Sequence, residues 1–303
     1  MANTRGNFSF TALQPLELPT ISKFKIGLCQ LSVSVDKNQN LIHAHNSIKF
    51  AAEKGARLVM LPEMWNCPYS NDYFAKYAEN FEEKDASPSF SMLSEAALSL
   101  GITIVGGSMP ECDSGMLFNT CCVFGADGKL KAKHRKVHLF DIDIPGDISF
   151  KESDIFTAGD RPTMVDTEMG CIGVGICHDI HFPELAMLYS AKGAHLICYP
   201  GAFNISTGEL LWELVQRARA ADNQLFVATC SPSRESNGSY MIWCHSTLVG
   251  PNGEIIATSG HEETVVVAEI DYSAIQLRRE HIPVQNQRRG DVYKFIDLVE
   301  HKP

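Results

Sequence analysis

The sequence of 303 residues lacks the features typical of membrane-spanning, secreted and nucleic-acid-binding proteins. Its apolar stretches all fall short of the roughly 20 residues that a membrane-spanning helix needs. Residues 1–23 have no charged start followed by an apolar core, so we expect no secretory signal. Basic residues are in the minority, with 26 Lys and Arg against 36 Asp and Glu, a net charge of −10. Nucleic acid is therefore excluded as an expected partner, because its binders need a basic footprint.

The ten cysteines include no C-x-x-C pair. Several of them, such as Cys198 in HLICYP and Cys230 in LFVATC, lie inside apolar runs. Such cysteines behave as small buried hydrophobic residues in a reducing compartment. A chain of this length buries about three quarters of its unfolded surface, so it needs no disulfide bonds. We therefore expect a cytoplasmic protein, with a mitochondrial location as the alternative because residues 1–23 hold few charges.

Apolar runs that suit β-strands alternate with amphipathic segments through the first 230 residues. The strands are predicted at 25–31, 57–63, 102–108, 171–177 and 195–201, and the helices at 38–54, 90–100, 183–193 and 208–223. The turn Ala126-Asp127-Gly128 predicts a hairpin of 116–125 with 129–136. Residues 137–162 resemble a loop. Further strands are predicted at 225–231, 243–250, 253–259 and 264–270, followed by a helix at 271–280 and a tail at 283–303.

This alternation of strands and helices indicates an α/β fold built on a mixed sheet. No linker or change of composition divides the chain, and no repeat of the solenoid type is visible. We therefore predict an N-terminal tail at residues 1–22 and one domain at 23–303.

Three polar residues follow apolar or strand-like runs. They are Glu63 after RLVML, Lys136 after KLKAKHR and Cys177 after CIGVGI. In open α/β sheets, ligands bind beyond the carboxyl ends of strands. A nucleophile on a sharp turn between strand and helix is exposed, and the backbone N–H groups that follow it point into the same space. The pattern therefore predicts that these side chains converge on one pocket.

Glu, Lys and Cys together supply the chemistry of amide cleavage without a metal or cofactor. A cysteine thiolate is strongly nucleophilic, and a carboxylate can take the thiol proton and later activate water. An ammonium group lowers the thiol pKa and stabilises the oxyanion. Each residue also has an ordinary structural interpretation: a buried cysteine, a solvated strand end and a lysine in an exposed charge run.

Five ordered blocks between residues 23 and 300 resemble the nitrilase superfamily, and most closely its ω-amidase branch. They are LPEMWNCPY (61–69), HRKVHLFDIDIPG (134–146), FKESDIFTAGD (150–160), GICHDIHFPELA (175–186) and YPGAFN (199–204). The resemblance implies a carbon-nitrogen hydrolase domain over 23–303. Its fold class would be α/β, a four-layer α-β-β-α sandwich of the nitrilase type that usually forms homodimers or higher homo-oligomers.

The resemblance also implies the roles of individual residues. Glu63, Lys136 and Cys177 match the catalytic triad, and Glu152 matches a second glutamate that supports the lysine. The oxyanion would be held by Lys136 and the backbone N–H of His178. The implied activity is hydrolysis of the terminal amide of 2-oxoglutaramate or 2-oxosuccinamate through a cysteine thioester, with no metal and no cofactor.

The nucleophile block departs from the branch at two positions. His178 stands where the family commonly has Tyr, and His181 stands where it has Arg. That Arg would help to hold the substrate's far carboxylate, so its loss affects the expected substrate more than the expected reaction. The resemblance places Tyr69, Phe203 and Thr207 at other substrate-binding positions.

The sequence leaves three alternative functions open. The first is an amidase that acts on deaminated glutathione or on an N-carbamoyl compound. The second is a metal-binding protein, although the usual ligand spacing is only partly met. Its candidate ligands are Cys177, His178, Asp179 and His181, with His134 and His138 four residues apart nearby. The third is a non-catalytic interaction protein, which the intact triad disfavours. The expected partner is a small-molecule amide, without nucleic acid or membrane.

Overall fold

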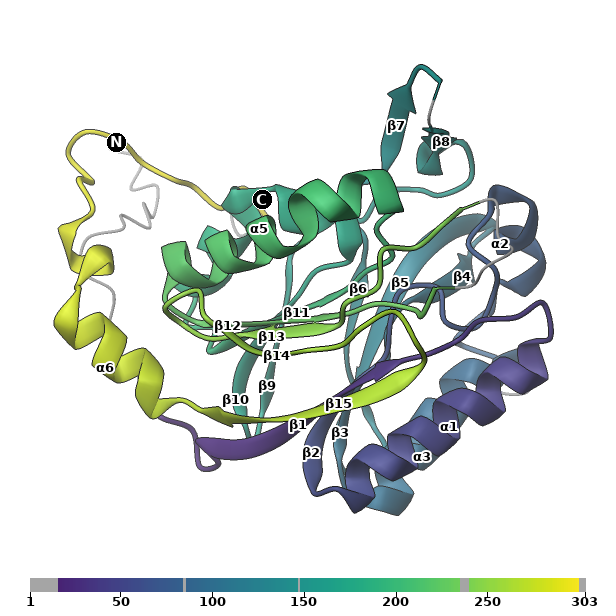
Figure 1. Cartoon of the computed structure of the whole chain (residues 1–303), viewed down its shortest axis with the longest axis horizontal. Coiled ribbons are helices and arrows are strands. Elements are labelled where there is room, and N and C mark those ends of the chain that lie inside the picture. Colours follow the sequence, from purple (N-terminus) through teal and green to yellow (C-terminus); the bar gives the residue numbers. More distant parts are fainter. Residues whose placement is uncertain (1–15, 84–85, 147, 235–239, 300–303) are drawn as a thin grey trace, which may run out of the picture.

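The computed structural model places two β-sheets face to face, with helices on both outer sides (Figure 1). It describes residues 16–83, 86–146, 148–234 and 240–299. The strands that alternate with helices along the chain are therefore divided between two sheets, where the sequence pattern predicted a single mixed sheet. The alternation of strands and helices along the chain indicates that helices cover a sheet, but it does not show which strands belong to the same sheet.

The first sheet has seven strands and carries the parallel strands of the N-terminal half. In spatial order they are β15 (Thr264–Asp271), β1 (Lys23–Gln30), β2 (Ala56–Met60), β3 (Thr103–Val105), β5 (Met116–Phe124) and β4 (Met109–Asp113), with β6 (Leu130–Arg135) paired to β5. β1, β2 and β3 are parallel, and the other pairs are antiparallel. The β5–β6 pair is the hairpin that the Ala126-Asp127-Gly128 turn predicted.

The second sheet has six strands. Their spatial order is β14 (Ile255–Thr258), β13 (Thr247–Val249), β12 (Phe226–Cys230), β11 (Leu196–Pro200), β10 (Gly170–Val174) and β9 (Thr163–Thr167). β10, β11 and β12 are parallel. Both sheets therefore have parallel central strands, which in proteins are buried on both faces.

Helices cover the outer face of each sheet (Figure 1). α1 (Lys37–Glu53) and α3 (Pro88–Leu100) pack on the first sheet, and α4 (Pro183–Ala191) and α5 (Ile205–Asn223) pack on the second. α1 begins at Asp36, whose carboxylate accepts the N–H groups of Asn38 and Gln39, and it ends before Gly55, where φ is 89°. α2 (Asn71–Tyr77) and α6 (Ser273–His281) lie outside these layers.

Side-chain alternation along the strands builds two cores. In β1, Ile26 and Leu28 point into the core between the sheets, whereas Cys29 belongs to the core under α1 and α3. In β2, Leu58 and Met60 face the other sheet in the same way. Because both faces of these strands are buried, they have continuous apolar runs rather than alternating ones. The resulting α-β-β-α arrangement confirms the predicted fold class.

The predicted loop at 137–162 contains regular structure. β7 (Asp141–Ile144) and β8 (Ile148–Lys151) form an antiparallel hairpin, followed by the short 3₁₀ helix η2 (Glu152–Asp154). Pro145 and Gly146 lie in the connection between the two strands rather than in a long loop, with Gly146 at φ 81°. The predicted strand 243–250 is also shorter in the structure, because Cys244 and His245 adopt left-handed backbone conformations with φ of 75° and 60°.

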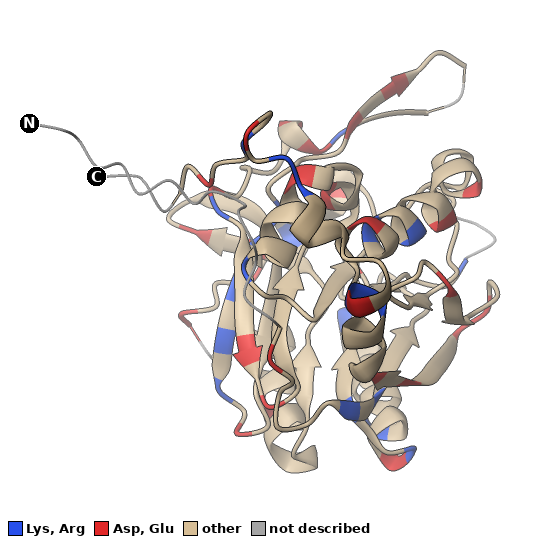
Figure 2. Cartoon of the chain, turned by 90° about the vertical axis from the view of Figure 1, so that its left-hand side faces the viewer, with Lys and Arg blue, Asp and Glu red and all other residues tan. Residues whose placement is uncertain are grey.

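The described part of the predicted N-terminal tail lies against the domain. Ile21 N–H donates to the carbonyl of Glu168, and the carbonyl of Glu17 lies 2.9 Å from His195 Nε2. Residues 1–15 of that tail are outside the described residues. In the described ranges, no helix is long and apolar enough to cross a membrane. In the view of Figure 2, acidic and basic residues are interspersed along the ribbons.

Candidate active site

Glu63 lies on a tight bend, three residues beyond the end of β2. The carbonyl of Pro62 accepts the N–H of Ser108 at 3.0 Å, which fixes the bend against the segment after β3. Gly107 makes this approach possible, because a Cβ at that position would lie 2.2 Å from the carbonyl oxygen of Pro62. Met64, the next residue, has a left-handed φ of 54°. The bend turns the Glu63 side chain inward, where it has no exposed surface.

Lys136 follows β6 directly and is held by backbone bonds on both sides. Its N–H donates to the carbonyl of Asn119 in β5 at 2.9 Å, and its carbonyl accepts the N–H of Gly159 at 2.8 Å. Its side chain is buried. Lys133, three residues earlier, points elsewhere and forms an ion pair of 2.6 Å with Glu111. Lys133 in β6 and Lys136 just after it therefore pair with two different sets of carboxylates.

Cys177 opens the short 3₁₀ helix η3 (Cys177–His181) between β10 and α4. Its backbone is in the left-handed region with φ 46°, which is uncommon for a residue with a side chain. Asp179 steadies the turn, because its carboxylate accepts the N–H of Ile176 at 2.9 Å. The N–H of Ala202 contacts Cys177 Sγ at 3.5 Å. This is the strand–turn–helix arrangement that the sequence predicted for a nucleophile.

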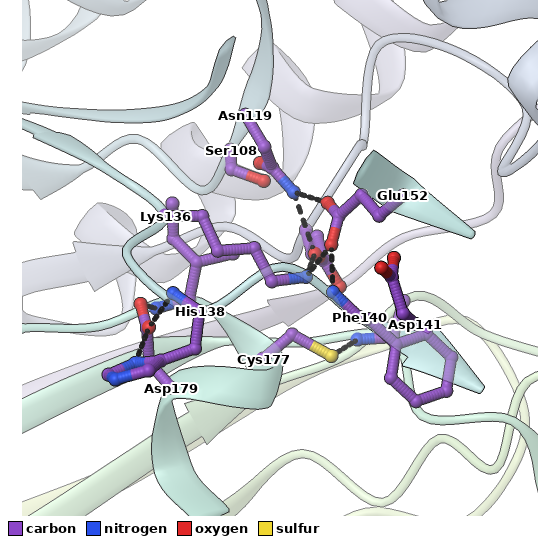
Figure 3. Close-up of polar contacts among 12 residues, drawn as sticks. Ser108, Asn119, Lys136, His138, Phe140, Asp141, Glu152, Cys177 and Asp179 are labelled. Carbon is purple, nitrogen blue, oxygen red and sulfur yellow. Dashed lines mark hydrogen bonds and ion pairs between the residues drawn. The ribbon is translucent and has the colours of Figure 1, made fainter. Parts of the chain in front are cut away.

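The structure brings Glu63, Lys136, Glu152 and Cys177 together in one buried cluster. Figure 3 labels Lys136, Glu152 and Cys177 of this cluster. Lys136 Nζ lies 3.0 Å from Glu63 Oε1 and 2.7 Å from Glu152 Oε2. Glu152 Oε2 also accepts the N–H of Phe140 at 2.7 Å, which anchors the second carboxylate. Two carboxylates thus share one ammonium group, out of contact with bulk water.

Burial and charge together set the ionisation of this cluster. Burial acts to lower the pKa of Lys136, but the carboxylates of Glu152 and Glu63 outweigh it and raise that pKa, so the amine stays charged. Burial raises the pKa of Glu63, and the Glu152 charge adds to the rise while Lys136 opposes it. A carboxyl group with a raised pKa can accept a proton and give it back near neutral pH.

Burial dominates the thiol pKa of Cys177. Burial and the nearby Glu63 carboxylate raise this pKa well above its usual value. The Lys136 charge lowers it, as the sequence predicted, and so does the N–H of Ala202, but burial outweighs both. The sequence alone did not show how strongly the thiol is buried. At neutral pH the thiol is protonated and needs a base to become a nucleophile.

The predicted substrate-binding residues on the nucleophile block pack against each other and against Phe203. The imidazole of His181 stacks on Phe203 with ring centres 5.2 Å apart, and His178 lies 5.0 Å from His181. Burial, followed by the Lys136 charge, lowers the pKa of His178 to about 4. Burial and the charges of Arg219 and Lys136 also lower the pKa of His181. Both imidazoles are therefore neutral at neutral pH.

A cavity of about 600 Å³ is lined by residues that include Tyr69, Phe150 and Tyr240, and none of the four cluster residues lines it. Of the predicted binding residues, all within the described ranges, Tyr69 is the one that lines it. Its ring stacks on Tyr240 with centres 4.5 Å apart, and the Tyr240 hydroxyl donates to the carbonyl of Ala202 at 3.0 Å. The N–H of Ala202 in turn contacts Cys177 Sγ. One residue, Ala202, therefore connects Tyr240 in the cavity wall to the thiol. Thr207 instead donates its hydroxyl to the carbonyl of Asn204, the residue that caps the start of α5.

The histidines considered as metal ligands surround a carboxylate. His134 Nε2 lies 3.1 Å from one oxygen of Asp179, and both the N–H and Nδ1 of His138 contact the other oxygen, at 2.9 and 2.7 Å. Although burial opposes it, these hydrogen bonds lower the pKa of Asp179. Within the described residues, no group of three or more His, Cys, Asp or Glu side chains could hold a metal ion. Asp179 thus ties the segment of Lys136 to the turn of Cys177.

Sequence reasoning missed Asn119, which lies in β5 of the β5–β6 hairpin and is a second residue of this region in the site, besides Lys136. It lies in the apolar run MLFNTCCVF, on the same face of the strand as Cys121 and Val123. These two residues face the core between the sheets. A polar side chain on a buried strand face needs partners, so this position carried a readable signal. Tyr240 had no such signal in the sequence, because this residue reaches the site from a segment 63 residues after Cys177 (240 − 177).

Comparisons with known proteins agree with this architecture. Residues 25–280 match the carbon-nitrogen hydrolase family. The chain is 62% identical over 285 residues to a protein named omega-amidase, chloroplastic, from Arabidopsis thaliana, covering 94% of this chain and 77% of the relative. It is 53% identical over 273 residues to omega-amidase NIT2 of Xenopus tropicalis, covering 90% of this chain and 98% of the relative.

Solved structures show the same relationship. Nit3 of Saccharomyces cerevisiae, described as a member of branch 10 of the nitrilase superfamily, superimposes with a TM-score of 0.83. It is 42% identical and covers 92% of this chain and 100% of its own. The chain therefore belongs to the carbon-nitrogen hydrolase family and, within the nitrilase superfamily, to its ω-amidase branch.

Proposed function

We propose that this protein is an ω-amidase that hydrolyses the terminal amide of small 2-oxo dicarboxylic monoamides, such as 2-oxoglutaramate and 2-oxosuccinamate. The products are the dicarboxylate and ammonia. The observation that carries the proposal is the buried cluster in which Lys136 bridges Glu63 and Glu152 beside the Cys177 thiol. A base, a fixed cation and a nucleophile are the groups that acyl transfer from an amide requires.

In the first half of the reaction, Glu63 takes the proton of Cys177 while the sulfur attacks the amide carbon. The carbonyl oxygen gains negative charge and lies against Lys136 and the backbone N–H of His178. The intermediate then collapses, the carbon–nitrogen bond breaks, and ammonia leaves with the proton that Glu63 received. A protonated resting thiol makes this base necessary, because the thiol cannot ionise unaided at neutral pH.

In the second half, water attacks the thioester carbon and gives its proton to Glu63. The same oxyanion contacts stabilise the second tetrahedral intermediate. The carbon–sulfur bond breaks, the carboxylic acid leaves, and Glu63 returns the proton to Cys177. Glu63 thus acts twice as a base and twice as an acid, which suits a carboxyl group whose pKa burial has raised.

A substrate panel tests the proposed function. 2-Oxoglutaramate and 2-oxosuccinamate should be hydrolysed with a kcat/KM at least about tenfold above that of N-carbamoyl amino acids and deaminated glutathione. Ammonia release measures the first two classes, and release of the new amine measures deaminated glutathione. A preference for deaminated glutathione would replace the proposed substrate and keep the mechanism. Absence of turnover on every member would contradict the proposed function.

His181 provides a sharper test of the substrate. An Arg at this position would be charged at every pH, whereas the pKa of His181 is lowered from its usual value near 6.5. Its charge is therefore already lost at neutral pH, and KM for 2-oxoglutaramate should stay flat from about pH 7 to about pH 8.5. The variant His181→Arg should lower that KM about tenfold, because it restores a charge-assisted contact with the far carboxylate.

Butyramide, which has no carboxylate, serves as the control for this variant. Its KM should not improve in His181→Arg. If KM for 2-oxoglutaramate were unchanged or higher in the variant, His181 would not face the substrate carboxylate. That result would favour an uncharged or larger substrate, which the cavity of about 600 Å³ has room to hold.

The outer helical layer is suited to pairing of two copies. Leu210 and Leu214 lie one turn apart on α5 and are 73% and 62% exposed. We expect a homodimer in which this layer is covered, since adjacent exposed leucines are a typical interface feature. Light scattering should give twice the mass of one chain, and Leu214→Glu should shift the mass toward that of a single chain. A monomeric wild-type protein would contradict this expectation.

A further inference from the structure

Asn119 contacts the carboxylates of the catalytic cluster, although it is neither a nucleophile nor an acid or base (Figure 3). It is 1% exposed, and its side chain projects from the middle of β5. Its Nδ2 donates to Glu63 Oε1 at 2.9 Å and to Glu152 Oε1 at 2.8 Å. Two carboxylate oxygens can only accept hydrogen bonds, so the NH₂ end of the amide must be the end that faces them.

The hydrogen bonds around Glu63 distinguish its two oxygens. Oε1 accepts from both Lys136 Nζ, at 3.0 Å, and Asn119 Nδ2, at 2.9 Å. Oε2 is buried and has no hydrogen-bond partner among the described residues. The neighbouring Cys177 thiol and the Glu63 carboxylate shift each other's pKa, so the two groups are close. The oxygen without a donor is the more basic one and the one free to receive the thiol proton.

We propose that Asn119 is a positioning residue that fixes Glu63 so that Oε2 serves as the catalytic base. The inference rests on the proposed function, because it assigns the proton acceptor of that reaction. Asn119 holds Oε1 together with Lys136, which prevents the carboxylate from rotating and presenting its already bonded oxygen to the thiol. It also spans Glu63 and Glu152, whose like charges would otherwise move apart.

The single positive charge of Lys136 does not balance the negative charges of two buried carboxylates. The cluster holds two buried carboxylates and one ammonium group. The two N–H groups of Asn119 are neutral donors to both carboxylates. A hydrogen bond to the charged form of Glu63 favours that form and so opposes the effect of burial on its pKa. Removing them should raise the pKa of Glu63 further, and a larger fraction of the enzyme would then hold a protonated base near neutral pH.

The test is the isosteric variant Asn119→Leu, which keeps the volume and removes both donors. At neutral pH kcat should fall about 10- to 100-fold, the range expected for hydrogen bonds to a charged group. The acid limb of the pH–kcat profile should move up by about one pH unit, because Glu63 must be ionised to act. KM should change less than twofold, since both N–H groups of Asn119 are engaged by Glu63 and Glu152 and neither is left for the substrate. Asn119→Ser, which keeps one hydroxyl donor and admits water, should show a smaller loss.

Thr120→Val is a matched control from the same strand. Thr120 is fully buried and donates its hydroxyl to Glu111 Oε2 at 2.7 Å, so the change also removes a buried hydrogen bond to a carboxylate. Adjacent strand residues point to opposite faces, and Glu111 belongs to the separate cluster with Lys133. The control should lose stability in thermal unfolding, yet keep the wild-type kcat and the wild-type acid limb.

Three results would distinguish failure of the positioning role of Asn119 from failure of the proposed function. A folded Asn119→Leu protein with wild-type kcat and an unmoved acid limb overturns the positioning role, while an inactive Glu63→Gln protein still supports the proposed mechanism. Full activity in Glu63→Gln would instead remove the proposed function itself. If Asn119→Leu does not fold, the Asn119→Ser profile decides: an upward shift of its acid limb supports the inference, and an unmoved limb overturns it.

Discussion

Replacing Cys177 by alanine is expected to lower kcat at least about 10⁴-fold, leaving no more than a trace of ammonia release. The variant removes the sulfur that forms the thioester and leaves Glu63 and Lys136 without a group to activate. The fold should persist, because the deleted atom is one sulfur and the turn is held by Asp179 and the backbone. Initial rates of ammonia release from 2-oxoglutaramate, with thermal unfolding in parallel, measure both parts.

Cys198→Ala and Cys230→Ala are the controls for the nucleophile. Both residues are buried in strands of the second sheet, so each change leaves a small cavity and lowers stability by about 1 kcal/mol, with activity retained. Mass spectrometry of acid-quenched wild-type enzyme should find the acyl group on the peptide that contains Cys177. Substantial turnover by Cys177→Ala, or an acyl group on another cysteine, would show that the proposed nucleophile is wrong.

Lys136→Met should lower kcat by at least about 100- to 1,000-fold, the effect of losing one oxyanion donor. Methionine keeps the packing of the buried side chain and removes its charge. The loss should be at the upper end of that range, because Glu63 and Glu152 would then be two buried carboxylates without a cation. Like charges raise one another's pKa, so one of the carboxyl groups would take up a proton. Steady-state kinetics at saturating substrate measure the effect.

Lys133→Met is the matched control for charge. Lys133 comes from the same hairpin strand but pairs with Glu111, which also accepts two hydrogen bonds from Arg135 at 2.8 Å. The remaining arginine keeps that carboxylate paired, so kcat should stay within about twofold of the wild type. Equal losses in the two lysine variants would indicate a general effect of positive charge and not a role for Lys136 at the oxyanion.

The resemblance to the nitrilase superfamily identified the family and the fold class, whereas local pattern reasoning gave the elements. The helix at 38–54, the hairpin around Ala126-Asp127-Gly128 and the helix that begins at Pro183 all appear in the structure. Each depends on local signals, such as a cap, a turn or a proline at the first helical position. The division into two sheets was not predictable in this way, because hydrophobic runs do not specify which strands become neighbours.

The features of the candidate site also differ in whether the sequence or the tertiary structure determined them. The sequence by itself determined that Glu63, Lys136 and Cys177 follow apolar or strand-like runs, since side-chain order and strand endings are local properties of the chain. Only the tertiary structure decided that Lys136 bridges two carboxylates and that Asn119 holds both. It also decided that burial raises the thiol pKa of Cys177. These outcomes depend on distances between segments up to 114 residues apart, 177 minus 63, and on the exclusion of water from the space between the sheets. Electrostatic interactions strengthen when water is excluded, so the same residues acquire their chemistry only when the fold encloses them.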